Sequence, residues 1–239
     1  MRYIPFLLAV VSMAHAQSAP PVTPGPAAES APLTTDDEQA IYALGLSIFR
    51  TLKQFDLSPE EVALVQRAIS DSVAGKPAAD LTEWAPKLPR FATAREARIT
   101  ERQKAASKAY LEKAAAEPGV ERTSSGLIYR EVTAGSGRSP KSNETVRVNY
   151  RGTLVDGTEF DSSYKRQKPA EFAVNGVIPC WTEGLQKMKA GGKSILVCPA
   201  SLAYGDRAQP SIPGGSALIF EIELLEILGK RPAPPRPAR

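Results

Sequence analysis

The sequence predicts a protein of the α+β class, in which an all-helical N-terminal arm and a long connecting helix precede an antiparallel sheet wrapped around one short helix. Three observations predict this order. Apolar residues recur at helical spacing up to Val73, a long stretch rich in Ala, Arg, Lys and Glu follows, and beyond Gly119 the pattern changes to the alternation of a half-buried strand. The length of 239 residues also exceeds the usual size of one domain, which favours two units joined by linkers.

Residues 1–16 have the pattern of a secretory signal peptide. Arg2 precedes an apolar run over residues 4–13 that is too short to span a membrane, and a small-residue cleavage site ends at Ala16. An uncleaved N-terminal anchor is the alternative interpretation. We therefore predict an exported protein whose mature chain has no transmembrane segment.

Removal of this leader also removes His15, the one histidine of the chain. Imidazole acid/base catalysis, Ser-His-Asp or Cys-His nucleophile activation and His-ligated zinc are then excluded. The predicted mature chain keeps 29 Lys and Arg against 26 Asp and Glu. This excess of positive charge is too small to indicate nucleic acid as a partner. No metal-ligand spacing is present in the second half of the chain, so we expect neither a metal nor a cofactor.

Two segments are predicted to be disordered: a Pro/Ala-rich linker at 17–33 and a Pro/Arg-rich tail at 230–239. Between them, residues 34–85 are predicted to form helices. Thr35 with Glu38 has the capping-box pattern, and Ser58-Pro59-Glu60-Glu61 combines an N-cap serine, an N1 proline and an N3 glutamate. The apolar stripes are Ile41, Leu44, Ile48, Leu52 and Phe55, then Val62, Val65, Ile69 and Val73. Because so few residues make only a small core, we predict that this region dimerises.

Residues 86–118 are predicted to form a long connecting helix. The pattern is polar nearly all round, with Lys108 and Glu112 at i,i+4, and indicates an exposed helix that joins two domains. A basic helix that binds nucleic acid is the less favoured alternative, because glutamates interrupt the positive charge.

Residues 119–229 are predicted to form a compact α+β domain. Val146, Val148 and Tyr150 alternate with polar residues as in a half-buried strand, and Asp156-Gly157 indicates a turn. The other predicted strands are Thr158–Phe160, Leu127–Val132, Glu171–Val174, Ser194–Cys198 and Ala217–Ile227, with a short helix at Trp181–Met188. Aromatic residues gather near the ends of these elements, which is typical of a core and, less often, of a ligand pocket.

Four stretches of this domain closely resemble the FKBP-type peptidyl-prolyl isomerases: VRVNYRGTLVDGTEFDSS (146–163), FAVNGVIPCWTEGLQKMKAGGK (172–193), LVCPASLAYGD (196–206) and ALIFEIELLEI (217–227). The N-terminal part, from TTDDEQAIYALGLSI through FDLSPEE, is similar to the helical dimerisation region of bacterial periplasmic FKBP chaperones of the macrophage-infectivity-potentiator type. The resemblance therefore implies a periplasmic homodimer, with association with the outer membrane as a further option.

The resemblance also implies a shallow apolar pocket for a proline ring, with the indole of Trp181 as its floor. It implies that Tyr204 donates its hydroxyl to a substrate carbonyl, that the backbone N–H of Ile178 is a second donor, and that Asp161 is a polar partner at the rim. The residues implied to be catalytic are Tyr150, Phe160, Asp161, Val177, Ile178, Trp181, Tyr204 and Phe220. Those implied to bind substrate are Arg166, which partners Asp161, Phe172 and Ile212.

The implied activity is acceleration of X-Pro bond rotation, which needs no proton transfer and so suits a chain without histidine. The implied partners are proline-containing unfolded or nascent polypeptides and macrolide inhibitors of the rapamycin type. A role as a folding chaperone is expected in addition. The alternatives are a non-catalytic holdase-type chaperone and a surface interaction protein.

The sequence departs from the family pattern at several positions. Ala170 stands where many members have an aromatic residue, the loop 208–212 is altered, and Gly214-Gly215 replaces a more proline-rich stretch. Cys180 stands where glycine is usual. In an exported protein, an even pair of cysteines suggests a disulfide between Cys180 and Cys198, and two buried thiols are the alternative.

Overall fold

A computed structural model describes residues 32–229 of the chain. The predicted signal peptide, most of the predicted linker and the predicted tail lie outside these residues. The chain divides into two compact units, with the boundary after Ile48. Within the described range, no helix is both long enough and apolar enough to cross a membrane.

Helix α1 (Asp36–Leu52) begins at the capping box that the sequence predicts. The backbone N–H of Glu38 donates to Thr35 Oγ1 at 3.2 Å, and the N–H of Thr35 donates to Glu38 Oε2 at 3.0 Å. Two of the N–H groups that every helix start leaves unpaired are thereby satisfied. None of the residues of α1 is buried, so its apolar side chains face outward.

The second unit continues with the 3₁₀ turn η1 (Lys53–Phe55), α2 (Pro59–Val73), α3 (Leu81–Trp84), the turn η2 (Ala85–Lys87) and α4 (Leu88–Ala115). Ser58 caps α2 in the predicted capping box with Glu61. Glu61 also forms an ion pair with Arg95 of α4, and Phe55 stacks on Phe91 of α4 with ring centroids 6.0 Å apart. These contacts join η1 and α2 to the first half of α4.

The predicted exposure of the connecting helix is contradicted along one stripe of α4. Thr100, Ser107 and Ala114 are buried, with exposed fractions of 8%, 4% and 5%. These residues recur at intervals of seven, so they lie on one face of the helix. The stripe consists of small and hydroxyl-bearing residues, and a search for apolar periodicity therefore does not detect it.

The sheet has the strand order β1-β2-β6-β7-β3-β4, and β5 pairs with β3 beside β4. All pairs are antiparallel. The strands are β1 (Val120–Arg122), β2 (Ile128–Thr133), β3 (Thr145–Leu154), β4 (Glu159–Ser162), β5 (Ala170–Ala173), β6 (Lys193–Cys198) and β7 (Leu218–Gly229). The sequence predicts each of them within a few residues except β1, which is only 3 residues long.

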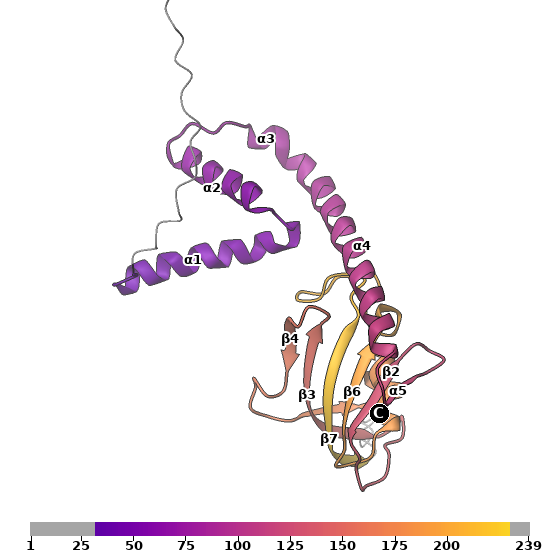
Figure 1. Ribbon diagram of the computed structural model, residues 1–239. Coiled ribbons are helices and arrows are strands. Elements are labelled where there is room, and N and C mark those ends of the chain that lie inside the picture. The colour runs from indigo at the N-terminus through magenta and orange to yellow at the C-terminus, as the bar shows by residue number, and fades with distance from the viewer. Residues whose placement is uncertain (1–31, 230–239) are drawn as a thin grey trace, which may run out of the picture. The chain divides into compact units, whose positions relative to one another are not determined.

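The two faces of the sheet bury different sets of side chains. On one face, Leu127, Tyr129, Leu196 and the short helix α5 (Pro179–Lys187) belong to the main core. The neighbouring residues Ile128 and Val197 point the other way, because side chains alternate along a strand, and pack against the C-terminal end of α4. The sheet therefore lies between α5 and the C-terminal end of α4. Figure 1 shows this end of α4 beside β2 and β6.

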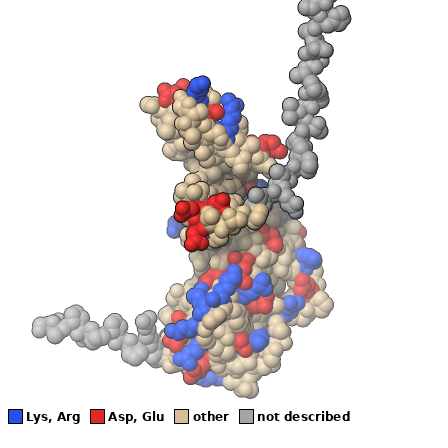
Figure 2. All heavy atoms as spheres, turned by 90° about the vertical axis from the view of Figure 1, so that its left-hand side faces the viewer, with Lys and Arg blue, Asp and Glu red and all other residues tan. Residues whose placement is uncertain are grey.

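The exposed side of β3 and β7 carries charged side chains of both signs. Arg147 of β3 forms ion pairs with Glu171 at 2.9 Å and Glu226 at 2.8 Å, and Arg151 pairs with Glu159 at 2.8 Å. Figure 2 shows blue and red side chains next to one another over this domain. Exposed ion pairs of this kind each contribute about 0–1 kcal/mol to the free energy of unfolding, so they stabilise the fold only slightly.

A disulfide joins Cys180 of α5 to Cys198 of β6, with their Cα atoms 5.7 Å apart. Both cysteines are fully buried. The bond therefore fastens α5 to the centre of the sheet. This arrangement confirms the disulfide over the alternative of two buried thiols.

The disulfide gives a testable prediction. Its cysteines are 18 residues apart, and closing a loop of that length stabilises a domain by about 3 kcal/mol by restricting the unfolded chain. We expect the Cys180→Ala/Cys198→Ala variant to lose about this much free energy of unfolding in urea titrations. Reductant should destabilise the wild type and leave the variant unchanged; equal unfolding midpoints for the oxidised wild type and the variant would contradict the prediction.

Candidate active site

Five aromatic side chains form a cluster between α5 and the sheet, which we call the aromatic cluster: Tyr150, Phe160, Phe172, Trp181 and Phe220. Trp181 lies at its centre. The ring centroids of Tyr150, Phe172 and Phe220 lie 5.1, 5.4 and 5.2 Å from that of Trp181, at interplanar angles of 87°, 82° and 88°. These are edge-to-face contacts, which suit the ring quadrupoles. Aromatic rings from β3, β5 and β7 thus surround the indole.

A glycine in β3 allows two of these rings to approach the sheet. A Cβ atom on Gly152 would lie 2.7 Å from the ring of Phe160 and 3.0 Å from that of Phe220. Distances this short are not tolerated between carbon atoms, so this position requires glycine. Sequence reasoning missed the role of Gly152, although glycine inside a strand often signals such a close approach.

Three aliphatic residues border the aromatic cluster. Ile212 is 8% exposed and belongs to the core, whereas Val177 and Ile178 are half-buried and pack against it. Ile178 is also the N-cap of α5. Its backbone N–H donates to no other group within residues 32–229. A donor is therefore available beside the cluster.

Tyr204 is the implied aromatic site residue that lies outside the apolar cluster. It follows Ala203, which packs against the cluster, and its side chain is 41% exposed. In the described part of the chain its hydroxyl has no hydrogen-bond partner. The loop that carries Tyr204 can therefore present a free hydroxyl to a ligand.

A polar network links the cluster to the surface. The hydroxyl of Tyr150 donates to Asp161, and Arg166 donates both to Asp161 and, at 2.7 Å, to the hydroxyl oxygen of Tyr150. The backbone N–H of Ser162 donates to Asp161 at 2.8 Å. The structure thus brings together three residues that the resemblance placed in the site, including the pairing of Arg166 with Asp161.

The network sets the charges of its members. Burial by itself would raise the pKa of Asp161, but the hydrogen bonds from Tyr150 and Arg166 and the charge of Arg166 leave this pKa below its ordinary value of 3.8. Burial raises the pKa of Tyr150 above its ordinary value of 10.0, and the hydrogen bond to Asp161 acts in the same direction. At neutral pH, Asp161 is therefore ionised and Tyr150 keeps its proton.

Two further features of the site were not predicted. Ser163 is fully buried; its hydroxyl accepts from the backbone N–H of Tyr150 at 2.9 Å, and its own N–H donates to the carbonyl of Tyr150 at 2.9 Å. A serine hydroxyl thus completes the backbone pairing beside Tyr150, and nothing in the local sequence signals it. The buried Nε1 of Trp181 has no hydrogen-bond partner among the described residues.

Comparisons with known proteins identify this arrangement. A family model described as "FKBP-type peptidyl-prolyl cis-trans isomerase" matches residues 136–225, and one described as "Domain amino terminal to FKBP-type peptidyl-prolyl isomerase" matches residues 37–130. The chain belongs to the FKBP-type peptidyl-prolyl isomerases. It is therefore an enzyme that accelerates the cis-trans rotation of X-Pro bonds, as the resemblance implies.

Individual relatives align along most of the chain. The FKBP-type isomerase FkpA of Escherichia coli strain K12 is 40% identical over 238 residues, which covers 94% of this chain and 86% of that protein. The protein named "Outer membrane protein MIP" of Legionella longbeachae is 37% identical, over 84% of this chain and 90% of that protein. The crystal structure of Escherichia coli FkpA matches with a TM-score of 0.64 and 38% identity, over 84% of this chain and all of that one.

The charges of the polar network give a prediction for this isomerase. Because the pKa of Asp161 is lowered and that of Tyr150 is raised, neither group changes charge between about pH 5 and pH 9. We expect kcat/KM for a short X-Pro peptide to vary by less than about twofold over this range. Below the lowered pKa, protonation of Asp161 breaks its pair with Arg166, so activity should fall only at more acidic pH. A bell-shaped profile centred near pH 7 would contradict this prediction.

Proposed function

We propose that the aromatic cluster binds the ring of a proline residue against Trp181 and that the groups around it catalyse rotation of the preceding amide bond. The observation that carries this proposal is the edge-to-face enclosure of Trp181 by Tyr150, Phe172 and Phe220. Flat apolar walls at right angles suit a compact saturated ring. Val177, Ile178, Ile212 and Phe160 extend the apolar surface.

The chemistry required is electrostatic. Rotation about an X-Pro bond breaks amide resonance and has a barrier of about 18–20 kcal/mol. The planar amide is the more charge-separated form, so an apolar environment disfavours it relative to the twisted transition state. A rate increase of about 10⁵ requires preferential stabilisation of the transition state by about 7 kcal/mol. Exclusion of water and a few oriented donors can supply that amount.

Two groups at the border of the cluster are suited to hold the substrate carbonyls while the imide nitrogen rotates. These are the hydroxyl of Tyr204 and the backbone N–H of Ile178, neither of which is engaged by another described residue. Both are neutral donors. Ile178 is the N-cap of α5, and Tyr204 follows the turn η4 (Ala200–Leu202), so each residue is attached to a defined backbone element. Donors that are oriented in advance do not have to reorganise during the reaction.

We propose that Asp161 fixes the position of Tyr150, whose ring forms one side of the site. Its carboxylate accepts from Tyr150 and from Arg166, so it fixes the Tyr150 ring against Trp181 and keeps a charged group at the rim. Arg166 also lies over the ring of Tyr150, with its guanidinium carbon 5.5 Å from the ring centroid. The proposed substrates are proline-containing unfolded or nascent polypeptides, and a rapamycin-type macrolide should compete for the same surface.

A peptide isomerisation assay tests the site. We expect Tyr204→Phe to lower kcat/KM about tenfold, because a hydrogen bond worth about 1.4 kcal/mol to the transition state is lost. Asp161→Ala should lower kcat/KM by at least as much, since it releases both Tyr150 and Arg166. Tyr164→Phe is the matched control, because Tyr164 is an exposed tyrosine of the same domain outside the cluster; its activity should equal that of the wild type.

The same assay separates the catalytic proposal from the alternatives. Wild-type activity that neither variant reduces, and that a rapamycin-type macrolide does not inhibit, would place catalysis elsewhere. Suppression of client aggregation by a wild type that lacks isomerase activity would favour the holdase-type chaperone. A chaperone role beside catalysis predicts that the Tyr204→Phe variant still suppresses aggregation.

The proposed location is the periplasm, reached by a cleaved signal peptide, with association with the outer membrane as the open alternative. Two observations support export. Residues 1–16 have the composition of a secretory leader, and the buried Cys180–Cys198 disulfide belongs to an oxidising compartment.

We further propose that the helical arm forms a homodimer. Neither α1 nor α2 buries any residue. On α1, Ile41 and Leu44 are 71% and 62% exposed, and Tyr42, Leu46 and Phe49 widen the apolar surface around the helix. A helix that is apolar over so much of its circumference requires a partner. A second copy of the same helix pair satisfies this requirement for both chains.

Sedimentation at micromolar concentration tests the homodimer. We expect the wild type to sediment as a dimer and Leu44→Glu to shift it to the monomer, because a buried unpaired carboxylate costs several kcal/mol. Ala43→Glu places the same charge on the adjoining polar face of α1, which also carries Arg50, and should remain dimeric. A monomeric wild type, or equal behaviour of the two variants, would overturn the proposal.

A further inference from the structure

We propose that Ser107 and Lys104 of α4 are positioning residues for the active site, because they hold the loop that carries Tyr204 and Ile212. We call residues 203–217 the rim loop. The proposal deepens the proposed function and rests on the role given there to Tyr204. It assigns part of the isomerase site to the connecting helix, which lies outside the residues matched by the catalytic family model.

The buried hydroxyl of Ser107 is bonded to the second half of the rim loop. It donates to the carbonyl of Gly215 at 3.0 Å and accepts from the backbone N–H of Ala217 at 2.7 Å. Ala217 is fully buried and directly precedes β7. One side chain of α4 therefore satisfies both an acceptor and a donor of buried loop backbone, which no apolar side chain could do.

Lys104 contacts both halves of the rim loop. Its Nζ forms an ion pair with Asp206 at 2.8 Å, two residues after Tyr204. Its stem lies against Gly215, where a Cβ atom would come within 2.7 Å of Lys104 Cγ. Thr100, Lys104 and Ser107 are spaced at i, i+4 and i+7, so they lie on one face of α4, and this face contacts the loop at Asp206, Gly215 and Ala217.

These contacts explain the Gly214-Gly215 pair in which the sequence departs from the family pattern. Gly215 has φ +76°, and its missing Cβ makes room for Lys104 and for the carbonyl of Thr100. A Cβ on Gly214 would come within 2.2 Å of the carbonyl oxygen of Asp206 and within 2.9 Å of Thr100 Oγ1. Gly215 therefore permits α4 to approach the loop backbone closely, and Gly214 first of all permits the two halves of the loop to approach each other.

The other hydrogen bonds of the rim loop are mostly internal. The N–H of Gly215 donates to Gly205 at 2.9 Å, and Gln209 and Ile212 exchange backbone bonds of 2.8 and 3.1 Å. Such bonds maintain the shape of the loop and do not orient it relative to Trp181. Ile212 in the core and the bond from the N–H of Gly205 to the carbonyl of Ala200 at 2.8 Å also anchor the loop. Ser107 and Lys104 add the contacts that fix its outer side to α4, and we infer that the position of Tyr204 depends on them as well.

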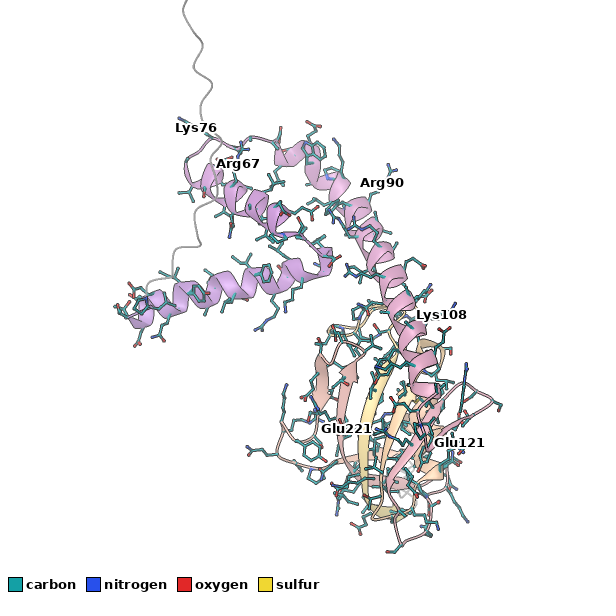
Figure 3. All side chains as sticks on the ribbon, in the orientation of Figure 1. Arg67, Lys76, Arg90, Lys108, Glu121 and Glu221 are labelled. Carbon is teal, nitrogen blue, oxygen red and sulfur yellow. A yellow bond between two sulfur atoms is a disulfide. The ribbon has the colours of Figure 1, made fainter. Side chains whose placement is uncertain are left out.

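The test uses the full-length chain with Ser107→Ala, Lys104→Met and Lys104→Arg. Lys104→Met keeps the stem against Gly215 and removes the charge, whereas Lys104→Arg retains the ion pair. Three controls lie on the same helix. Thr93→Ala removes an exposed hydroxyl, Lys108→Met removes an exposed lysine (Figure 3), and Ala114→Gly weakens the contact of α4 with the sheet away from the loop.

We expect Ser107→Ala and Lys104→Met to raise KM for the peptide about three- to tenfold with a smaller change in kcat, because a mobile loop lowers the fraction of binding-competent enzyme. Amide hydrogen exchange at Gly215 and Ala217 should accelerate about tenfold or more in Ser107→Ala. Lys104→Arg, which retains the ion pair, should have the KM of the wild type. Ala114→Gly should lower the melting temperature without changing KM.

A double variant makes the test specific for positioning. If Ser107 acts through Tyr204, then Ser107→Ala should have a smaller effect on KM in a Tyr204→Phe background than alone. Additive effects, or exchange and KM values in Ser107→Ala equal to those of Thr93→Ala, would overturn the proposal. If Tyr204→Phe itself leaves activity unchanged, the proposed function of Tyr204 fails, and the exchange rates still decide whether Ser107 holds the loop.

Discussion

Edge-to-face packing on Trp181 is the interaction on which the rest of the catalytic domain depends. The three enclosing rings come from β3, β5 and β7, so the sheet must bend around α5 to bring them together. A slip of one residue in the β3–β7 pairing would turn Tyr150 or Phe220 to the opposite face. Two further features maintain this geometry. The disulfide at Cys180, the residue before Trp181, holds α5 against the sheet, and the absence of a side chain at Gly152 makes room for the rings of Phe160 and Phe220.

The polar groups of the proposed site surround this apolar centre, and the proposed mechanism requires no proton transfer. Asp161 is kept ionised by Tyr150 and Arg166, and the donors that we propose at Ile178 and Tyr204 are neutral. Amide rotation needs an environment that disfavours the planar dipolar amide and holds its carbonyl, and it makes or breaks no bond. The absence of histidine outside the predicted leader is therefore compatible with efficient catalysis.

Local signals in the sequence were sufficient for the elements with local causes. Ser58 with Glu61 and Thr35 with Glu38 are capping boxes in the structure, and the alternation around Val148 marks β3. Contacts between distant segments could not be predicted in this way. The buried stripe at Thr100 and Ser107 of α4 lacks apolar periodicity, because both residues carry hydroxyl groups, and that of Ser107 is bonded to backbone more than 100 residues further along the chain.

By itself, the sequence determined the order of the parts, their helical or extended character and the family of the catalytic domain, because capping, side-chain periodicity and contiguous motifs are encoded within short stretches. The tertiary structure decided which of these residues meet. It joined Tyr150 to Asp161 and Arg166, left the hydroxyl of Tyr204 free, and brought α4 against the rim loop. The physical reason is that each of these contacts joins residues from separate elements, and their distances are set only when the sheet closes over Trp181.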